Sequence, residues 1–329
     1  KKYIPLFRGQ FLLAALLFLA TEFAFLAAFV QPASAVGEVF RVTTYEFQTA
    51  EFTGTSYTLT LKNDLETDYF TMISGPSIST TTRGPDEDFI RVTADPHGNF
   101  GTSTSADELS FGRGDASFNW IGAVTVVECT IACDTVGFEL TQVLETDLTA
   151  AAVTGTQDTD LDTLDANHTP NTVPFGARFG GGISTSDIEA TAYAVTTATK
   201  ISKTGSNQLS FDRFGAEDDI PAAATVTTYI TEWGSEWNVQ DVNVTGTNAG
   251  SGLDAVGEYN TAGITSVVRD NSWVWGNGFA HDDGLGDGAY GQAITLGDGV
   301  TQNATETLVA VGSEGAQIAP GRDFQVYVL

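Results

Sequence analysis

Short runs in which apolar and polar residues alternate recur along most of the chain. Residues 57–61 are Tyr-Thr-Leu-Thr-Leu, and residues 226–231 alternate in a similar way. A period of two residues is typical of a half-buried β-strand, because successive side chains point to opposite faces. Residues 68–73 are mostly apolar, which predicts a strand buried on both faces. The pattern therefore predicts a mainly β protein.

One apolar run near the N-terminus is much longer than the others. Residues 11–30 are interrupted only by Thr21 and Glu22, and basic residues precede them. One interpretation is a secretory signal peptide that ends at Ala-Ser-Ala, residues 33–35. The other is a transmembrane helix, which needs about 20 apolar residues, whereas apolar signal regions run to about 7–15. We expect a retained, single-pass helix with a cytoplasmic N-terminus and a periplasmic or extracellular body.

Glu22 lies in the middle of this apolar run. A carboxylate at the centre of a bilayer costs about 2.5–3.5 kcal/mol on insertion scales. One interpretation is a protonated side chain that lipid tolerates, and the other is a contact with a second protein helix. We expect a helix contact, because small alanine side chains in the same run allow close approach.

An internal repeat with a period of about 100 residues is the strongest signal in the exported part. Residues 107–113 and 207–213 share the pattern Leu-Ser-Phe-x-Arg, and each is followed by an acidic loop and two β-rich runs. This repeat predicts antiparallel β-sandwich modules. The predicted divisions are a cytoplasmic N-terminus at 1–10, a transmembrane helix at 11–30, a first module at 31–153, a linker or long loop at 154–171, a second module at 172–250, and a C-terminal β segment at 251–329 that completes the second module or forms a third.

The chain is strongly acidic, with 42 acidic and 14 basic residues and a net charge of −28. This charge excludes nucleic acid as a partner, because phosphate groups bind to basic surfaces. It is compatible with a well-solvated surface, a salty medium, divalent cations or a basic partner.

The only two cysteines, Cys129 and Cys133, are four positions apart. In an oxidising compartment this spacing predicts a local disulfide that closes a tight loop between strands. A metal site would need further ligands, and neither histidine nor another cysteine lies nearby in the sequence.

The densest cluster of carboxylates and glycines lies at residues 281–299. Calcium binds six to eight oxygens from flexible loops, so we consider a calcium site formed by Asp282, Asp283, Asp287 and Asp298. The alternative is a set of ordinary hairpin turns, which Gly-Asp-Gly also favours. Residues 158–162 carry acids at alternate positions, like the start of a calcium loop, but lack the glycine and glutamate that should follow.

Other polar and aromatic motifs indicate no catalytic site and no cofactor. Three histidines lie far apart, and known nucleophile, metal-protease and phosphate-loop motifs are absent from the sequence. Aromatic residues between 229 and 275 suit either a sugar platform or a packed core, and the second is more usual in strands. Three Asn-x-Thr sequons begin at Asn167, Asn243 and Asn303, and their side chains should be exposed.

These features predict a non-enzymatic, membrane-anchored structural or accessory subunit of a larger membrane or envelope assembly. Its partners would be other protein subunits, contacted by the exported β-sandwich modules, and the lipid bilayer, contacted by residues 11–30. The alternative is a secreted or surface binding module, similar in role to an adhesin or lectin, with calcium as a candidate ligand.

Overall fold

A computed structural model shows a protein built almost entirely of β-strands. The structure describes residues 38–74, 90–103, 105–113, 116, 119–149, 157–176, 182–184, 199–214, 224–245, 259–278, 291–314 and 323–329. Within these ranges the strand pairings are antiparallel, apart from a two-residue parallel pairing of β4 with β5. The predicted mainly β class is therefore confirmed.

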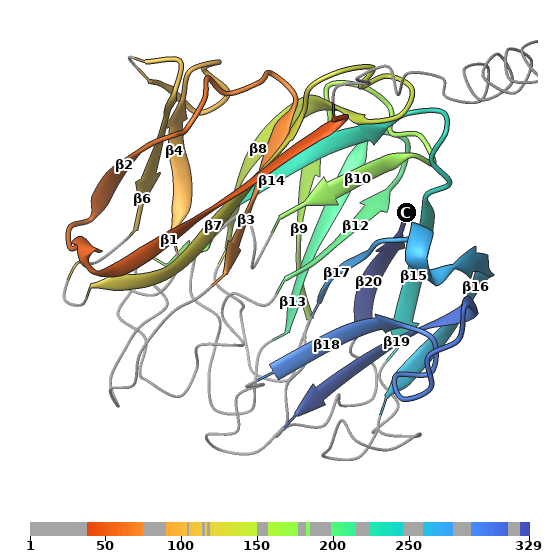
Figure 1. The fold of residues 1–329 in the computed structure, drawn as a ribbon. Coiled ribbons are helices and arrows are strands. Elements are labelled where there is room, and N and C mark those ends of the chain that lie inside the picture. Colours follow the sequence, from red (N-terminus) through yellow and green to blue (C-terminus); the bar gives the residue numbers. More distant parts are fainter. Residues whose placement is uncertain are drawn as a thin grey trace, which may run out of the picture. The chain divides into compact units, whose positions relative to one another are not determined.

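The strands form three consecutive groups along the chain (Figure 1). The first group comprises β1 (Phe40–Phe52), β2 (Ser56–Thr60), β3 (Tyr69–Ser74), β4 (Arg91–Asp95), β5 (Gly101–Thr102), β6 (Glu108–Gly112) and β7 (Trp120–Cys129). The second comprises β8 (Phe138–Leu148), β9 (Gln157–Thr163), β10 (Thr172–Phe175), β11 (Gly182–Ser184), β12 (Lys200–Thr204), β13 (Gln208–Phe214) and β14 (Ala224–Trp233). The third comprises β15 (Gln240–Thr245), β16 (Asn260–Val268), the 3₁₀ turn η2 (Arg269–Asn271), β17 (Val274–Gly278), β18 (Gly291–Leu296), β19 (Thr305–Glu314) and β20 (Asp323–Val328).

Each group contains two sheets with the same order of pairing. In the first group β7 lies between β1 and β3, and β6 lies between β2 and β4. In the second group β14 lies between β8 and the successive strands β10 and β11, and β13 lies between β9 and β12. In the third group β20 lies between β15 and β17, and β19 lies between β16 and β18. The last strand of every group is thus the centre of one sheet.

Apolar side chains from both sheets of a group fill its core. In the second group, Leu144 of β8 and Ile230 of β14 pack with Leu209 and Phe211 of β13. In the third group, residues of β15 and β20 pack with residues of β18 and β19. Burying such side chains contributes about 1.5–3 kcal/mol each, and this burial is the main force that holds the two sheets together.

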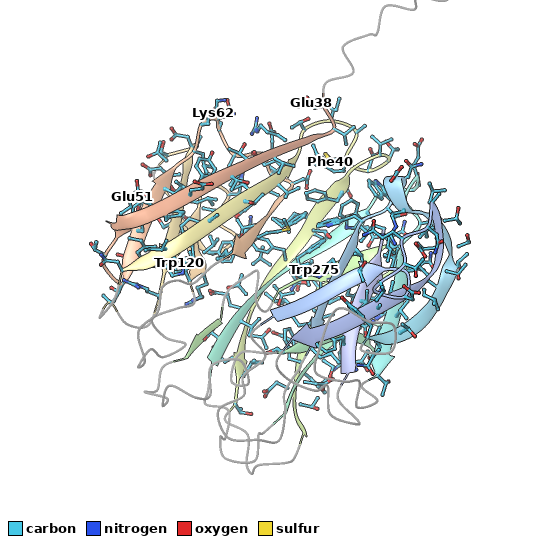
Figure 2. The ribbon with its side chains drawn as sticks, turned by 60° about the horizontal axis from the view of Figure 1, so that its bottom comes forward. Glu38, Phe40, Glu51, Lys62, Trp120 and Trp275 are labelled. Atoms are coloured by element: carbon cyan, nitrogen blue, oxygen red, sulfur yellow. A yellow bond between two sulfur atoms is a disulfide. The ribbon has the colours of Figure 1, made fainter. Side chains whose placement is uncertain are left out.

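A buried aromatic cluster joins the three groups. The ring of Phe70 in β3 stacks on that of Phe175 in β10, with centroids 4.2 Å apart and planes at 3°. Trp273, which precedes β17, lies within 6.2 Å of Phe70 and 5.6 Å of Phe175. Figure 2 labels two further members, Phe40 of the first group and Trp275 of the third. Aromatic pairs of this kind add about 0.5–1.5 kcal/mol beyond the buried area.

The connections between groups also pack on one another. The β7–β8 connection contains the predicted disulfide between Cys129 and Cys133, which is confirmed with an S–S distance of 2.07 Å. In this loop the carbonyl of Thr135 accepts a hydrogen bond from the N–H of Glu236, which belongs to the β14–β15 connection. The indole N–H of Trp237 donates to the carbonyl of Val136 over 2.8 Å. The β7–β8 connection therefore contacts the link between the second and third groups.

Residues 154–171, which the sequence predicts as a linker or long loop, include strand β9. Asp160 and Asp162 of this edge strand pair with Phe211 and Leu209, so they share the core-facing side of the sheet. Their carboxylates accept hydrogen bonds from the hydroxyls of two threonines next to and within β8, Thr149 and Thr146. Inward-pointing charges protect an edge strand from pairing with another chain. This pairing explains the alternating acids without a calcium loop.

The predicted membrane helix at 11–30 lies outside the described residues. Within the part of the chain that the structure describes, no helix is long and apolar enough to cross a membrane. Residue contacts divide the chain into two units, Lys1–Glu38 and Val39–Leu329, and all three strand groups belong to the second unit.

Candidate functional site at the Lys203 junction

A lysine connects the second strand group to the third. Lys203 lies near the end of β12, just before the turn that leads into β13. Gly205 in this turn has φ +61°, a backbone conformation that glycine adopts without strain. The turn brings β13 back alongside β12. The Lys203 side chain is only 7% exposed. A lysine this deeply buried needs partners for its ammonium group.

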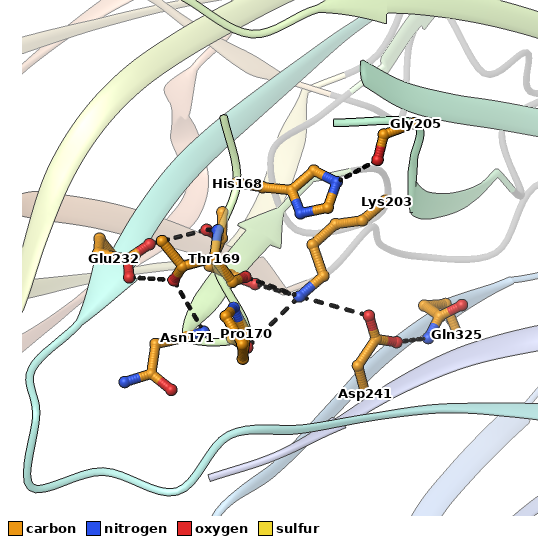
Figure 3. A network of polar contacts seen from close by, with 10 residues as sticks. His168, Thr169, Pro170, Asn171, Lys203, Gly205, Glu232, Asp241 and Gln325 are labelled. Atoms are coloured by element: carbon orange, nitrogen blue, oxygen red, sulfur yellow. Dashed lines mark hydrogen bonds and ion pairs between the residues drawn. The ribbon is translucent and has the colours of Figure 1, made fainter. Parts of the chain in front are cut away.

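Those partners are carbonyl oxygens and one carboxylate (Figure 3). The Nζ of Lys203 donates to the carbonyl of Thr172 over 3.0 Å, and to those of Thr169 and Pro170 over 3.4 and 3.5 Å. The carboxylate of Asp241 in β15 lies 3.4 Å away and supplies the opposite charge. We call Lys203, the three carbonyl groups that accept its hydrogen bonds and Asp241 the Lys203 junction.

Two further contacts hold the third group at this position. Lys203 Nζ lies 5.7 Å from the ring centroid of Tyr327 in β20, a cation–π arrangement. The side-chain amide of Gln325, also in β20, donates a short hydrogen bond to Asp241. Burial raises the pKa of the Tyr327 phenol well above its ordinary value, and the nearby Asp241 charge adds to this effect. Tyr327 is therefore neutral at physiological pH.

Polar contacts from the second group fix the loop that supplies the carbonyls. Glu232 of β14 accepts a hydrogen bond from the Thr172 hydroxyl over 2.7 Å and a shorter one from the Thr169 hydroxyl. A ring nitrogen of His168 lies 3.1 Å from the carbonyl of Gly205, in the turn after β12. Contacts within the second group thus hold this loop, independently of the third group.

The junction borders a depression of about 490 Å³ that opens to solvent. Its lining residues are His168, Thr169, Pro170, Lys203, Val239 and Asp241. The ammonium group of Lys203 already has carbonyl and carboxylate partners on several sides, so this geometry suits a structural role more than acid–base or covalent chemistry. No cluster of three or more His, Cys, Asp or Glu among the described residues is arranged to hold a metal ion.

Of the four predicted calcium ligands, only Asp298 lies within the described residues. Its carboxylate accepts hydrogen bonds from the N–H groups of Val300 and Thr301, over 3.0 and 2.6 Å. These two bonds are the main cause of its lowered pKa. Asp298 thus closes a turn between Gly297 and Gly299, both with positive φ. Asp282, Asp283 and Asp287 lie outside the described residues, as does the predicted helix contact Glu22.

The aromatic residues considered as a sugar platform lie in the junction between groups. Trp233 and Trp275 are 3% and 5% exposed, and Tyr229 is fully buried. The Tyr229 hydroxyl and the Thr71 hydroxyl of β3 are 2.9 Å apart. Tyr229 and Trp233 pack against Tyr69 and Phe40 of the first group, and Trp275 of the third group packs against Phe175 of the second. These side chains therefore belong to the buried core between the groups, as the second interpretation of the sequence pattern expects.

Sequence analysis did not single out Lys203 or Asp241. The available signal was weak: a lysine beside a turn in an acidic chain is usually a solvated surface residue. Its partners are backbone carbonyls and a residue 38 positions away, and neither leaves a local motif.

Comparison of the chain with models of known protein families, with curated proteins and with solved structures finds no match in any of the three.

Proposed function

We propose that the chain is an exported structural subunit, anchored in a membrane by residues 11–30, whose body is three related β-sandwich modules that act as one unit. The observation that carries this proposal is the junction of the three strand groups, where Phe70, Phe175 and Trp273 stack on one another. Side chains from every group are buried there. A group that was separated from the other two would therefore expose apolar surface to water.

The module interpretation is supported by equivalent contacts in all three groups. The N–H of Leu61 donates to the carbonyl of Asp107, and the N–H of Leu164 donates to that of Asn207. In the third group the corresponding bond joins Arg269 to the carbonyl of Ala304. Each of these bonds continues the pairing of the second strand with the strand at the centre of that sheet.

The repeated sequence pattern occupies the same position in the first two groups. Leu109 and Phe111 of β6 are completely buried, and so are Leu209 and Phe211 of β13. Both strands lie at the centre of their three-strand pairing. The third group has the same order of strand pairing as the first two but lacks the Leu-Ser-Phe pattern. This combination is expected of a third copy whose sequence has diverged.

A body with this construction favours a role in assembly. Its polar clusters in the described residues, such as the Arg41–Glu128 pair at 2.5 Å, bind strands and loops together. The disulfide adds a crosslink that forms in an oxidising, exported compartment. In this proposal the helix at 11–30 holds the body at the membrane, and Glu22 contacts a helix of a partner subunit.

The N-terminus of the mature chain tests the anchor. The protein is isolated from membranes of the cells that produce it, and its terminal peptide is identified by mass spectrometry. We expect residues 11–30 to be present and the chain to resist extraction by alkaline carbonate. A mature chain that begins at Val36 and is released by carbonate would overturn the anchored role.

A further inference from the structure

We propose that Asn167, Asn243 and Asn303 are acceptor sites for N-linked glycans. The proposal rests on the exported location in the proposed function, because glycan transfer takes place on exported chains. Each site has the Asn-x-Thr pattern, with threonine at 169, 245 and 305. The structure shows the exposure and the surroundings of the asparagine and the threonine in each sequon.

All three pairs are exposed to solvent. The asparagine and the threonine are exposed in every case, at 167 and 169, 243 and 245, and 303 and 305. A glycan is bulky and strongly hydrated, so it requires an acceptor on the surface. The fold therefore accommodates a glycan at each site without displacing a core side chain.

The site on β15 shows the arrangement in most detail. Asn243 and Thr245 are two positions apart on a strand, so their side chains lie on the same face. The amide Nδ2 of Asn243 lies 3.4 Å from the Thr245 hydroxyl oxygen and donates to it. The two groups of the sequon are thus side by side on an exposed surface.

Asparagines outside the sequons show a different use of the amide. The Nδ2 of Asn99 donates to the buried carboxylate of Asp95 over 2.8 Å, and that of Asn171 donates to the carbonyl of Trp233 over 3.1 Å. A third, Asn207, donates to the carbonyl of Leu164. Modification of these amides would break bonds that hold loops in place. Among the sequon amides, that of Asn243 donates to the exposed Thr245, and that of Asn303 donates to the Glu306 carboxylate over 3.5 Å, at the limit of a hydrogen bond.

The reaction requires a glycan donor with a phosphate leaving group, such as a lipid-linked oligosaccharide. The Nδ2 atom forms a bond to C1 of the first sugar, and the bond from C1 to the donor phosphate oxygen breaks. The amide loses one proton, and the donor leaves as its phosphate. No oxidation or reduction takes place.

Two of the sites border the depression at the Lys203 junction. Asn167 is next to His168, which lines it, and Asn243 is about 7 Å along β15 from Asp241, on the same face of the strand. Glycans at both positions would lie close to residues that line the depression. The first strand group carries no sequon, so the modified surface is confined to the second and third groups.

The test is mass spectrometry of the full chain, isolated from the cells that produce it. We expect glycopeptides at Asn167, Asn243 and Asn303, and the loss of one glycan mass in each of the variants N167Q, N243Q and N303Q. As matched controls, T245S and T305S keep the sequon and should keep the glycan, whereas N99Q and N207Q should leave the glycan mass unchanged.

The disulfide separates failure of this proposal from failure of export. An exported chain with the Cys129–Cys133 bond formed but with unmodified sequon peptides would overturn the glycan proposal alone. A chain that remains in the cytoplasm with both thiols reduced and no glycan would overturn both proposals.

Discussion

At the scale of single residues, Lys203 is a buried charged side chain whose partners come from two strand groups. Its ammonium group is held by three backbone carbonyls and by Asp241, and its aliphatic stem is buried with them. A charge in such a position stabilises the fold only while its partners are present, since an unpaired group would keep the cost of desolvation. The bond network therefore makes Lys203 a link between two strand groups.

Replacement of this lysine should weaken the link. We expect Lys203→Met, which keeps the length of the side chain, to lower the free energy of unfolding by about 2 kcal/mol. Urea denaturation followed by tryptophan fluorescence measures this change. Lys62→Met is the matched control, because Lys62 is exposed, and it should change stability by less than about 0.5 kcal/mol. Equal effects of the two variants would contradict the structural role.

Gly234 offers a second residue-scale prediction. A Cβ at this position would lie 2.2 Å from the carbonyl oxygen of Thr135, in the β7–β8 connection. Backbone atoms on both sides must shift to make room, so Gly234→Ala should cost about 2–3 kcal/mol. Gly263→Ala is the control, since nothing lies within 4 Å of its Cβ position. Thermal unfolding of both variants measures the difference, and a neutral Gly234→Ala would show that the two connections do not pack together.

At the scale of elements, the sequence predicted where strands lie along the chain better than it predicted which strands pair with one another. The alternation at residues 57–61 and the apolar run at 68–73 both correspond to strands, β2 and β3. The Leu-Ser-Phe pattern lies in β6 and in β13, each paired with a strand on both sides, and its leucine and phenylalanine are buried in both strands. Strand existence depends on local side-chain pattern, which a single sequence contains.

Pairing depends on distant residues and was harder to predict. β8 follows β7 directly in the chain and the sequence placed it in the first module, yet its residues pair with β14, from Phe138 with Trp233 to Leu148 with Ala224. Likewise the acids of β9 suggested a loop, because aspartate is depleted in strands, and only their threonine partners across the core explain the strand. Most hydrogen-bond partners of Lys203 and Asp298 are backbone groups, and the Asp241 carboxylate beside Lys203 is 38 positions away, so neither leaves a local sequence pattern.

Three buried tyrosines in central or edge strands predict the response to alkaline pH. Burial raises the pKa values of Tyr69 in β3, Tyr229 in β14 and Tyr327 in β20. The unfolded chain releases these phenol protons near pH 10, whereas the folded protein retains them. Their contribution to stability is therefore complete below about pH 10 and falls as the pH rises above it.

The urea midpoint should accordingly fall as the pH rises above about 10, and Tyr327→Phe should reduce this fall. The Tyr327 hydroxyl is buried and has no hydrogen-bond partner among the described residues, so its removal should not destabilise the protein at pH 7. A midpoint that is unchanged up to pH 11 in the original chain would show that these tyrosines are accessible to solvent.

At the scale of the whole molecule, the net charge of −28 opposes the compact state through mutual repulsion of carboxylates. Figure 2 shows charged side chains such as Glu51 at the outside of the body, where salt screens them. The Debye length falls from roughly 14 Å at 0.05 M to about 3 Å at 1 M salt. Repulsion over the surface should therefore decrease as salt is added.

We expect the urea midpoint to rise as NaCl is increased from 0.05 to 1 M. Calcium chloride at matched ionic strength distinguishes general screening from a specific site at residues 281–299. An equal rise in both salts indicates screening, whereas a larger rise with calcium that Asp298→Ala abolishes would support the calcium-binding alternative. A midpoint that falls with NaCl would contradict the repulsion argument.

We propose that this three-group body is a subunit of a membrane assembly. The most direct measurement is the native mass of the chain after extraction in a mild detergent. The claim predicts a complex of fixed stoichiometry, larger than the 34.7 kDa chain. Glu22→Leu should dissociate it, whereas Thr21→Leu, about 100° around the helix, should not. A free monomer with no other protein bound would contradict the claim.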